Sequence, residues 1–435
     1  MSIQHVKYLL IGGGLASTAG AQAIRRLDNE GEMLLIGQEV VRPYHRPALS
    51  RDYLLGRRSK PDLFTLQDTW FTENRVELRT GRRVAHLDTA RRSATLDSGE
   101  EVSFDKALIA TGASPKHLSI PGADLPSVYY LRTLADADRL HNAVEQAKRA
   151  GRAHARGTGR GRAGVIGSGP LAIELAATLT QLGIETDLVV GTPHPWYRFA
   201  GENTGRFLVR YLEKHGVAVH TGRRAQRLEG DGRTQRIVLP SEDAAGEVIP
   251  CDFVVAAIGV SINKEILRGT PLLAERAILT DDHCRTSEPD VYAAGDCAAV
   301  YDPLFGKHRI LDHWDNALVT GALAGGNMAG ADLAYSAVNT FSSEVFDLSV
   351  SVWGEGRLVD RRLLRGMPTL EAPECVEIGI AKDGRVAQVL ALRRGGTADH
   401  QTADEPFIKL VKCRLLVDGN EEKLKDPAVP LDRLM

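Results

Sequence analysis

One pattern occurs twice in this chain, and it constrains the fold more than any other feature of the sequence. A short apolar run leads into a glycine-rich turn, and small and apolar residues at helical spacing follow. The first copy comprises residues 6–11, the turn Gly12 to Gly14 and residues 15–27; the second comprises residues 163–166, the turn Gly167 to Gly169 and residues 170–182. A second predicted strand follows each helix, at residues 33–36 and at residues 187–190. Each copy predicts strand, turn, helix and strand in succession.

The two copies predict an α/β fold. Runs that are apolar throughout are typical of strands buried on both faces of a parallel sheet. Pro170 suits a first helical turn, where its missing N–H costs nothing, and Gly183 suits the position just after a helix. We therefore expect two doubly wound, Rossmann-like domains.

Both turns have the spacing of a dinucleotide-binding fingerprint. They are Gly12-x-Gly14-x-x-Ser17 and Gly167-x-Gly169-x-x-Ala172. The first glycine permits the tight turn, the second lets the backbone approach a pyrophosphate, and the N-terminus of the following helix stabilises the phosphate charge. Ser17 replaces the usual third glycine and is small enough for close packing of helix against strand. A glycine turn without a ligand is the alternative, and the intact unit argues against it.

The residues that would hold the ribose differ between the two copies. An acidic residue about 20 positions after the turn is expected to bind ribose hydroxyls. Gln38 and Glu39 stand there in the first copy, whereas the second strand of the other copy ends at Gly191 without an acid. His194 and Arg198 follow; they face a 2′-phosphate in one interpretation and are surface residues in the other. The choice between NADH and NADPH stays open, and a site that has lost its nucleotide is the less favoured alternative.

Composition bounds the class of protein. A chain of 435 residues is expected to form two or three domains, and 43% hydrophobic with 25% charged residues is ordinary for a globular protein. A net charge of −2 gives no general affinity for nucleic acid or for anionic membranes. No long apolar window or leader pattern appears, so we expect a cytoplasmic location without membrane contact. The five cysteines are scattered, which predicts no metal site, no structural disulfide and no redox-active pair.

Two further regions differ in character from the repeated units. Residues 148–162 are rich in Arg, Gly and Ala, and a solvated loop is favoured over a basic docking arm. After about residue 330, runs at residues 376–381, 385–392 and 407–417 predict strands of a smaller α+β C-terminal domain.

Several segments together resemble one family. They are residues 42–51 (RPYHRPALSR), the turn Ala110-Thr111-Gly112, residues 286–296 (TSEPDVYAAGD) and residues 313–328 (HWDNALVTGALAGGNM). With the two fingerprints, they resemble the FAD-dependent pyridine nucleotide oxidoreductases of the ferredoxin reductase and apoptosis-inducing factor group, which includes monodehydroascorbate reductase. The resemblance covers residues 5–330 well and the remainder weakly.

The resemblance implies a domain order and a reaction. An FAD domain, residues 1–125 and 255–330, is interrupted by an NAD(P) domain, residues 126–254, and followed by an interface domain, residues 331–435. A hydride would pass from nicotinamide C4 to flavin N5, and the flavin would release electrons to an acceptor. The implied cofactor-binding residues are Gly12, Gly14, Leu15, Ala16, Gln38, Glu39, Arg46, Arg51, Ala110, Thr111, Gly112, Gly295, Asp296, Asp312, His313 and Trp314 for FAD, with Gly167, Gly169, Pro170, Leu171, Glu174 and Gly259 for the nicotinamide nucleotide.

The chain departs from the family pattern at the implied catalytic positions. The family lysine near flavin N5 is Arg51 here, and its glutamate partner corresponds to Glu174, so Arg51 and Glu174 are the expected catalytic pair. Arginine is a rigid, permanently charged fork, so the exchange is not neutral. The aromatic residue over the flavin falls at about Ser342, with Phe341 and Phe346 as substitutes.

The family's cysteines are absent from residues 40–55, which predicts that electrons leave the flavin directly and not through a thiol. Cys297 follows Asp296, and packing is favoured over redox chemistry for it. Residues 42–60 carry six basic residues and one acid; one interpretation is a rim that steers an acidic ferredoxin or rubredoxin, and the other is contacts with FAD phosphates or solvent.

We therefore expect an FAD-dependent NAD(P)H oxidoreductase that passes electrons to a small, acidic iron–sulfur protein of the ferredoxin or rubredoxin type. A reductase or oxidase acting on quinones, radicals or oxygen is one alternative. A slow flavin-based redox sensor or interaction protein is the other. No nucleic acid or membrane partner is expected, and a homodimer is left open.

Overall fold

A computed structural model describes residues 3–153, 159–232, 236–240, 246–272, 276–396 and 404–434. The chain divides into two compact units, and each is described by itself. Unit 1 comprises residues 1–45, 60–114 and 260–339, and unit 2 comprises residues 46–59, 115–259 and 340–435.

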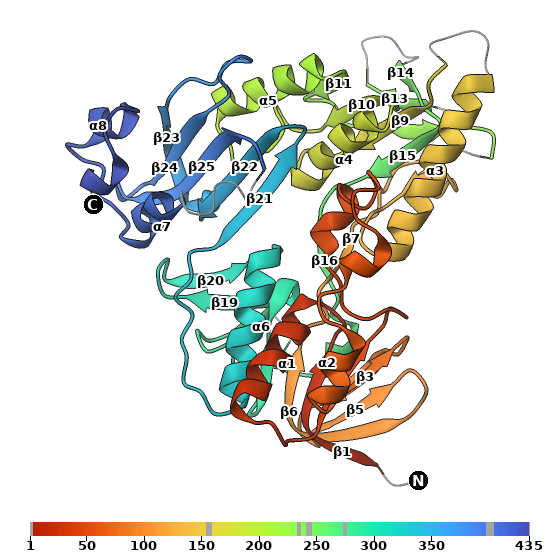
Figure 1. Cartoon of the computed structure of the whole chain (residues 1–435), viewed down its shortest axis with the longest axis vertical. Helices are drawn as coiled ribbons and strands as arrows, with labels where there is room; N and C mark the ends of the chain where they lie inside the picture. Colours follow the sequence, from red (N-terminus) through yellow and green to blue (C-terminus); the bar gives the residue numbers. More distant parts are fainter. Residues whose placement is uncertain are drawn as a thin grey trace. The chain divides into compact units, whose positions relative to one another are not determined.

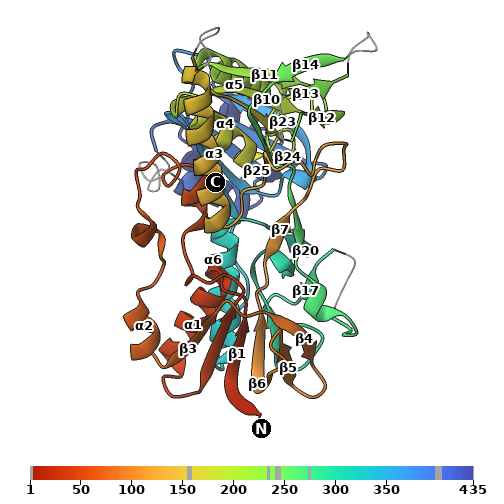
Figure 2. The same ribbon diagram turned by 90° about the vertical axis from the view of Figure 1, so that its right-hand side faces the viewer.

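Unit 1 is built on a seven-stranded sheet. The strand order is β3-β2-β1-β6-β5-β4, with β18 pairing with β6; strands β3, β2, β1, β6 and β18 are parallel, whereas β5 and β4 are antiparallel additions. Figure 2 shows β1, β6, β5 and β4 side by side. The bounds are β1 (Gln4–Ile11), β2 (Met33–Gly37), β3 (Val76–Thr80), β4 (Val84–Asp88), β5 (Ser93–Leu96), β6 (Glu101–Ile109) and β18 (Val291–Ala293).

The smaller elements of unit 1 complete it. They are the sheet β17 (Ile278–Thr280), β19 (Ala298–Asp302) and β20 (Lys307–Ile310), the paired strands β7 (Ala113–Pro115) and β16 (Val260–Ile262), the helices α1 (Leu15–Leu27), α2 (Asp68–Glu73) and α6 (Trp314–Met328), and the 3-10 turns η2 (Lys60–Leu63), η3 (Glu265–Leu267) and η4 (Gly295–Cys297).

Glycines allow α1 and α6 to lie unusually close together. The two helices run side by side in unit 1 (Figure 1). A Cβ on Gly321 of α6 would lie 2.2 Å from the carbonyl oxygen of Ala16, and one on Gly325 would lie 2.3 Å from that of Gly20. Because no real Cβ tolerates such distances, the glycine-rich sequence of α6 is explained by this helix contact.

Unit 2 contains the second parallel sheet. Its order is β11-β10-β9-β15-β8, and a three-stranded antiparallel sheet, β12-β13-β14, accompanies it. The bounds are η1 (Arg46–Ser50), β8 (Val128–Tyr129), α3 (Leu134–Ala153), β9 (Arg162–Ile166), α4 (Pro170–Gln181), β10 (Glu185–Val190), α5 (Glu202–Lys214), β11 (Val217–Thr221), β12 (Arg227–Glu229), β13 (Arg236–Leu239), β14 (Glu247–Pro250) and β15 (Phe253–Ala256).

Unit 2 also holds a five-stranded antiparallel sheet from the C-terminal part of the chain, in the order β21-β22-β25-β24-β23. Its elements are β21 (Thr340–Val345), β22 (Leu348–Gly354), η5 (Gly356–Leu358), β23 (Val359–Arg365), β24 (Cys375–Ala381), β25 (Val386–Arg394), α7 (Glu405–Lys412), α8 (Glu421–Lys425) and η7 (Leu431–Leu434). The α/β fold with Rossmann-like parallel sheets and an extra C-terminal sheet is confirmed. The exact domain boundaries stay a prediction.

Two expectations about local structure are wrong. Residues 407–417 are not a strand: α7 forms there, because Phe407, Leu410 and Val411 have helical spacing and Leu410 and Val411 are fully buried. Residues 148–153 are not loop either, since they belong to α3. The basic stretch expected as a loop continues through residues 154–158, which lie outside the described residues.

Two properties of the whole chain bear on its class. All five cysteines are free thiols, and only Cys413 is exposed. No helix within the described ranges is long and apolar enough to cross a membrane.

Candidate functional site

Strand register in unit 1 brings three distant segments to one edge of the sheet. Ile11 of β1 pairs with Ile109 of β6, and Ile109 pairs with Ala293 of β18. All three strands are parallel, so the residues that follow them meet at the carboxyl edge, where doubly wound folds bind their ligands. The three glycine-containing segments singled out from the sequence are therefore neighbours in space.

The first turn is built for close approach of backbone. Gly12 has φ +127°, and a Cβ there would lie 2.1 Å from the carbonyl oxygen of Ala110. In contrast, a Cβ on Gly14 would meet nothing within 4 Å. Gly12 thus serves the protein's own packing, while Gly14 borders open space at the N-terminus of α1, where Leu15 and Ala16 begin the helix. This is the arrangement that a pyrophosphate requires.

The two flanking segments are fixed by hydrogen bonds. Thr111 Oγ1 donates to the carbonyl oxygen of Asn263 at 2.7 Å, and the Asn263 N–H donates to the Gly112 carbonyl oxygen at 3.0 Å. The Gly295 N–H donates to Thr320 Oγ1 of α6 at 3.0 Å, and Gly295 has φ +73°. Asp296 follows in η4 and is buried. A buried aspartate at this edge fits the role of holding a hydroxyl-bearing chain, and that role stays a proposal.

Gln38 and Glu39 follow the end of β2, and of these two only Glu39 has a carboxylate. Its Oε2 accepts a hydrogen bond from the Tyr44 hydroxyl at 2.6 Å, whereas Gln38 is exposed. Glu39 is therefore the better candidate for binding the ribose of a dinucleotide in unit 1.

The start of α6 places an aromatic ring against a histidine. His313 is the N-cap residue of α6, and the Trp314 ring lies 4.3 Å from the ring of His45, centroid to centroid. Asp312 is exposed. Their contact with a flavin stays a prediction.

The second turn, in unit 2, repeats the construction of the first. Gly167 has φ +157°, and a Cβ there would lie 2.3 Å from the carbonyl oxygen of Ala257 after β15. A Cβ on Gly169 or on Gly259 would meet nothing within 4 Å. Pro170 and Leu171 open α4 directly afterwards. Because Ile166 pairs with Ala256, this turn also lies at the carboxyl edge of its sheet, so unit 2 presents a second backbone cradle of the same kind.

The two basic candidates after β10 differ in their surroundings. His194 is buried, its Nδ1 lies 2.8 Å from the Pro195 carbonyl oxygen, and a Cβ on Gly205 of α5 would lie 2.0 Å from it. Burial therefore argues against both interpretations of His194, as a phosphate ligand and as a surface residue. Arg198 is exposed.

Arg51 and Glu174 lie in unit 2, but each has other partners. Arg51 Nη1 forms an ion pair with Glu344 Oε2 of β21 at 2.8 Å. Glu174 Oε2 accepts from Ser50 Oγ at 2.6 Å, and its Oε1 accepts from Ser343 Oγ at 2.7 Å. Within the described residues, no ion pair joins Arg51 directly to Glu174. Instead, each of them contacts β21: Arg51 pairs with Glu344, and Glu174 accepts from Ser343.

Burial decides the protonation behaviour of Glu174. Burial disfavours the carboxylate and raises the pKa of Glu174, while the charge of Arg51 and the hydrogen bonds from the two serines act in the opposite direction. Arg46, the first residue of η1, has a different partner: its Nη1 donates to the Arg132 carbonyl oxygen at 2.8 Å.

Neither Phe341 nor Phe346 takes the aromatic position that was expected at about Ser342. Phe341 is buried against Phe199, with ring centroids 4.7 Å apart, on the strand face opposite to Ser342. Phe346 lies beyond the strand and stacks on His215 at 4.4 Å. The expectation that Phe341 or Phe346 takes that position is not supported by their contacts.

The basic stretch at residues 42–60 makes contacts within its own units. Arg42 pairs with Asp68 and lies over the Phe64 ring at 4.0 Å, Arg51 pairs with Glu344, and Arg58 Nε lies 3.8 Å from Asp52. These contacts favour structural roles for several of the arginines over an open docking rim.

The thiols of unit 1 are unsuited to redox exchange. Cys284 and Cys297 are fully buried, and burial raises the pKa of each thiol, which disfavours the reactive thiolate. Packing is therefore the role of Cys297.

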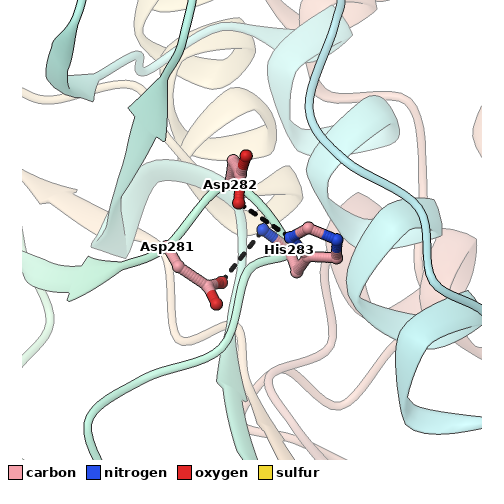
Figure 3. Close-up of side chains that lie close together, drawn as sticks. All are labelled: Asp281, Asp282 and His283. Carbon is pink, nitrogen blue, oxygen red and sulfur yellow. Dashed lines mark hydrogen bonds and ion pairs between the residues drawn. The ribbon is translucent and has the colours of Figure 1, made fainter.

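One acidic group in unit 1 has the ligand types of a metal site, and Figure 3 shows it: Asp281, Asp282 and His283. Asp281 Oδ1 accepts from the N–H groups of His283 and Arg285 at 2.9 and 2.8 Å, and Asp282 Oδ1 lies 2.7 Å from His283 Nδ1. These contacts account for the group as a hydrogen-bonded turn after β17, and we assign no ion to it.

Comparison with known proteins agrees with this geometry. Residues 6–321 match the pyridine nucleotide-disulphide oxidoreductase family. The chain is 29% identical over 404 residues to the ferredoxin–NAD(+) reductase component of a biphenyl dioxygenase system from Paraburkholderia xenovorans, covering 91% of this chain and 94% of that protein. It is 30% identical over 433 residues to a probable ferredoxin reductase from Castellaniella defragrans, covering 98% of each.

A solved structure extends the comparison to the fold. The crystal structure of a ferredoxin reductase from Rhodopseudomonas palustris shares 26% identity with a TM-score of 0.86, over 98% of this chain and 99% of that one. The chain therefore belongs to the pyridine nucleotide-disulphide oxidoreductase family and is an FAD-dependent oxidoreductase that uses a nicotinamide nucleotide.

Proposed function

We propose that the chain is a reductase that takes electrons from NAD(P)H and passes them from FAD to a small electron-transfer protein of the ferredoxin or rubredoxin type. The observation that carries the proposal is the pair of matched backbone cradles, one at Gly12 and Gly14 and the other at Gly167 and Gly169. In each, the first glycine is covered by a carbonyl oxygen of the chain and the other borders open space. Two such cradles suit two dinucleotides.

The residues of the chain would bind and orient the two nucleotides. The flavin, when bound, supplies the conversion between two-electron and one-electron transfer. Gly14 and the N-terminus of α1 would hold its pyrophosphate, and Glu39 its ribose. Thr111, Gly295 and Asp296 would hold the remaining chain at the carboxyl edge. Gly169 and the N-terminus of α4 would hold the nicotinamide nucleotide.

The acceptor is inferred from two lines of support. Cys284 and Cys297 are buried thiols whose pKa values are raised by burial, so a route through a thiol is disfavoured. Two relatives similar along most of their length bear the names of ferredoxin reductases. A small iron–sulfur protein would therefore take the electrons directly from the flavin.

Steady-state turnover separates this proposal from its rivals. The protein is supplied with NAD(P)H and, in separate assays, with ferredoxins, a rubredoxin, a quinone or an ascorbyl radical source. Turnover with a ferredoxin or rubredoxin supports the proposal. Turnover with quinone or radical alone indicates the small-molecule reductase. Flavin reduction that takes minutes with every nucleotide indicates the redox sensor.

A further inference from the structure

The structure points to a residue that selects the nicotinamide nucleotide. Val190 ends β10 and Gly191 follows it, so this strand end lacks the acidic residue that would hold the ribose hydroxyls of NADH. A Cβ on Gly191 would lie 3.1 Å from Cγ and 3.4 Å from Nε of Arg224. The Arg224 side chain thus lies over Gly191, directly beyond the strand end that lacks an acid, and the absence of a side chain at Gly191 leaves room for it.

The backbone fixes this arrangement. Val190 of β10 pairs in parallel with Thr221 of β11, so the segments after the two strands lie together. The Gly222 N–H donates to the Thr192 carbonyl oxygen at 2.9 Å, and the Arg223 N–H donates to the Val190 carbonyl oxygen at 3.2 Å. Gly222 has φ +70°, which completes the turn that leads to Arg224. Arg224 is therefore placed beside Gly191 by paired strands.

The surrounding charges leave Arg224 available for a ligand. Its neighbour Arg223 pairs with Glu247 and donates to the Pro240 carbonyl oxygen at 3.3 Å. His220 lies 2.8 Å from Asp187 and 3.7 Å from Glu247, so both acids already have basic partners. Arg224 itself is exposed, and among the described residues no hydrogen bond or ion pair reaches its guanidinium.

We propose that Arg224 binds the 2′-phosphate on the adenosine ribose of NADPH, so that the enzyme uses NADPH in preference to NADH. This inference rests on the proposed nicotinamide nucleotide site at Gly167 and Gly169. An acid at position 191 would repel a 2′-phosphate, whereas a guanidinium offers it paired, charge-assisted hydrogen bonds. His194 is buried and does not compete for this role. The preference would differ from that of the relative named as a ferredoxin–NAD(+) reductase.

The test measures flavin reduction in the full holoenzyme with each nucleotide. Wild type is expected to have a kcat/KM for NADPH at least about tenfold above that for NADH. Arg224→Gln should lower kcat/KM for NADPH by about tenfold or more and leave that for NADH within about twofold, because only the phosphate contact is lost. Arg210→Gln is the matched control, since Arg210 is an exposed arginine on α5 in the same unit; it should change neither value.

A binding measurement gives a readout apart from activity. Wild type should bind 2′,5′-ADP more tightly than 5′-AMP, and Arg224→Gln should abolish that difference. The double variant Gly191→Glu with Arg224→Ser should reverse the preference towards NADH. Gly191 does not have a positive φ, so glutamate is compatible with its backbone.

The outcomes separate the inference from the function on which it rests. If neither nucleotide reduces the flavin, the proposed function fails. If both reduce it and wild type shows no preference for NADPH, or if Arg224→Gln weakens both nucleotides equally, the inference about Arg224 is overturned and the proposed function stands.

Discussion

Glu174 of α4 accepts a hydrogen bond from Ser343 of β21 at 2.7 Å, and this contact joins α4 to the C-terminal sheet of unit 2. The same carboxyl group accepts from Ser50 of η1 at 2.6 Å. One buried side chain thus connects three segments that are far apart in the sequence. Beside it, Arg51, which directly follows η1, pairs with Glu344 of β21. A substitution of Glu174 should therefore change the stability of unit 2 as well as any catalytic role of this residue.

The pKa of Glu174 predicts a pH-dependent stability. Burial raises its pKa in the folded protein above the ordinary 4.5. A carboxyl group with a raised folded pKa stabilises the fold below its unfolded pKa, and that contribution is lost as pH rises from about 4.5 through the folded pKa. Wild type should therefore lose stability relative to Glu174→Gln over that interval.

Thermal or urea unfolding of the holoprotein across this pH range measures the difference. Glu202→Gln, at an exposed glutamate on α5, is the matched control and should show no such trend. A wild-type to Glu174→Gln difference that stays constant with pH would contradict the prediction.

Glu377 of β24 is predicted to be a major stabilising residue of unit 2. Its carboxylate accepts from the Gly201 N–H at the start of α5 at 2.8 Å and from Thr204 Oγ1 at 2.7 Å, and Arg362 Nη1 lies 2.7 Å away. Glu377→Ala would leave the half-buried Arg362 and the N-terminus of α5 without the buried carboxylate, so it should lower the free energy of unfolding by about 3–5 kcal/mol.

Denaturant unfolding checks this, with Glu374→Ala as the control. Glu374 lies near the start of the same strand, its side chain is 54% exposed, and its carboxylate lies 3.9 Å from Arg394. The two variants should differ clearly; equal and small losses would mean that Glu377 does not hold α5 to the sheet.

Substitutions of Gly14 and Gly169 are predicted to weaken nucleotide binding without unfolding the protein. Gly14 and Gly169 have φ −108° and −89°, and a Cβ on either would meet none of the described residues within 4 Å. Gly14→Ala should therefore keep the fold but reduce FAD content. Gly169→Ala should keep FAD and raise KM for the nicotinamide nucleotide about tenfold, or about 1.4 kcal/mol.

Flavin absorbance per protein and steady-state kinetics measure the two effects. Gly12→Ala is the contrasting variant: its Cβ would lie 2.1 Å from a carbonyl oxygen, so it should impair folding itself. Loss of FAD in Gly169→Ala, or unchanged FAD in Gly14→Ala, would show that the cradles are wrongly assigned.

The thiols predict a simple labelling result. Cys413 is exposed, and the other four cysteines are buried. An aromatic disulfide reagent should react quickly with one thiol per native chain and with five after unfolding. Electron transfer should survive this labelling, because the proposed route uses no thiol. Inactivation that Cys413→Ser prevents would point to a thiol in the reaction.

The repeated units could be predicted because their signals are local. Apolar strand runs and the glycines at 12 and 167 constrain the backbone within a few residues, and the structure places α1 at residues 15–27 as the sequence indicates. The two separate parallel sheets follow from the same pattern occurring twice in the sequence. Helix α7 was missed because its short apolar run fits a strand as well as a helix until buried Leu410 and Val411 decide the period.

The side-chain partners could not be predicted in the same way. Arg51 meets Glu344 and Glu174 meets two serines, because β21 contributes residues whose proximity only the tertiary fold determines. Arg224 was missed for a similar reason: it becomes a neighbour of Gly191 only through the pairing of β10 with β11. The two consecutive arginines after the β11 segment are the sequence signal that could have indicated it.

Anaerobic rapid mixing tests the central claim most directly. The holoprotein is mixed with NADPH or NADH and then with an oxidised ferredoxin, and flavin absorbance is followed throughout. The account predicts that the flavin bleaches within milliseconds to seconds and that its absorbance returns as the ferredoxin is reduced. A flavin that stays oxidised with both nucleotides, or one that bleaches but is not reoxidised by any ferredoxin or rubredoxin, would contradict it.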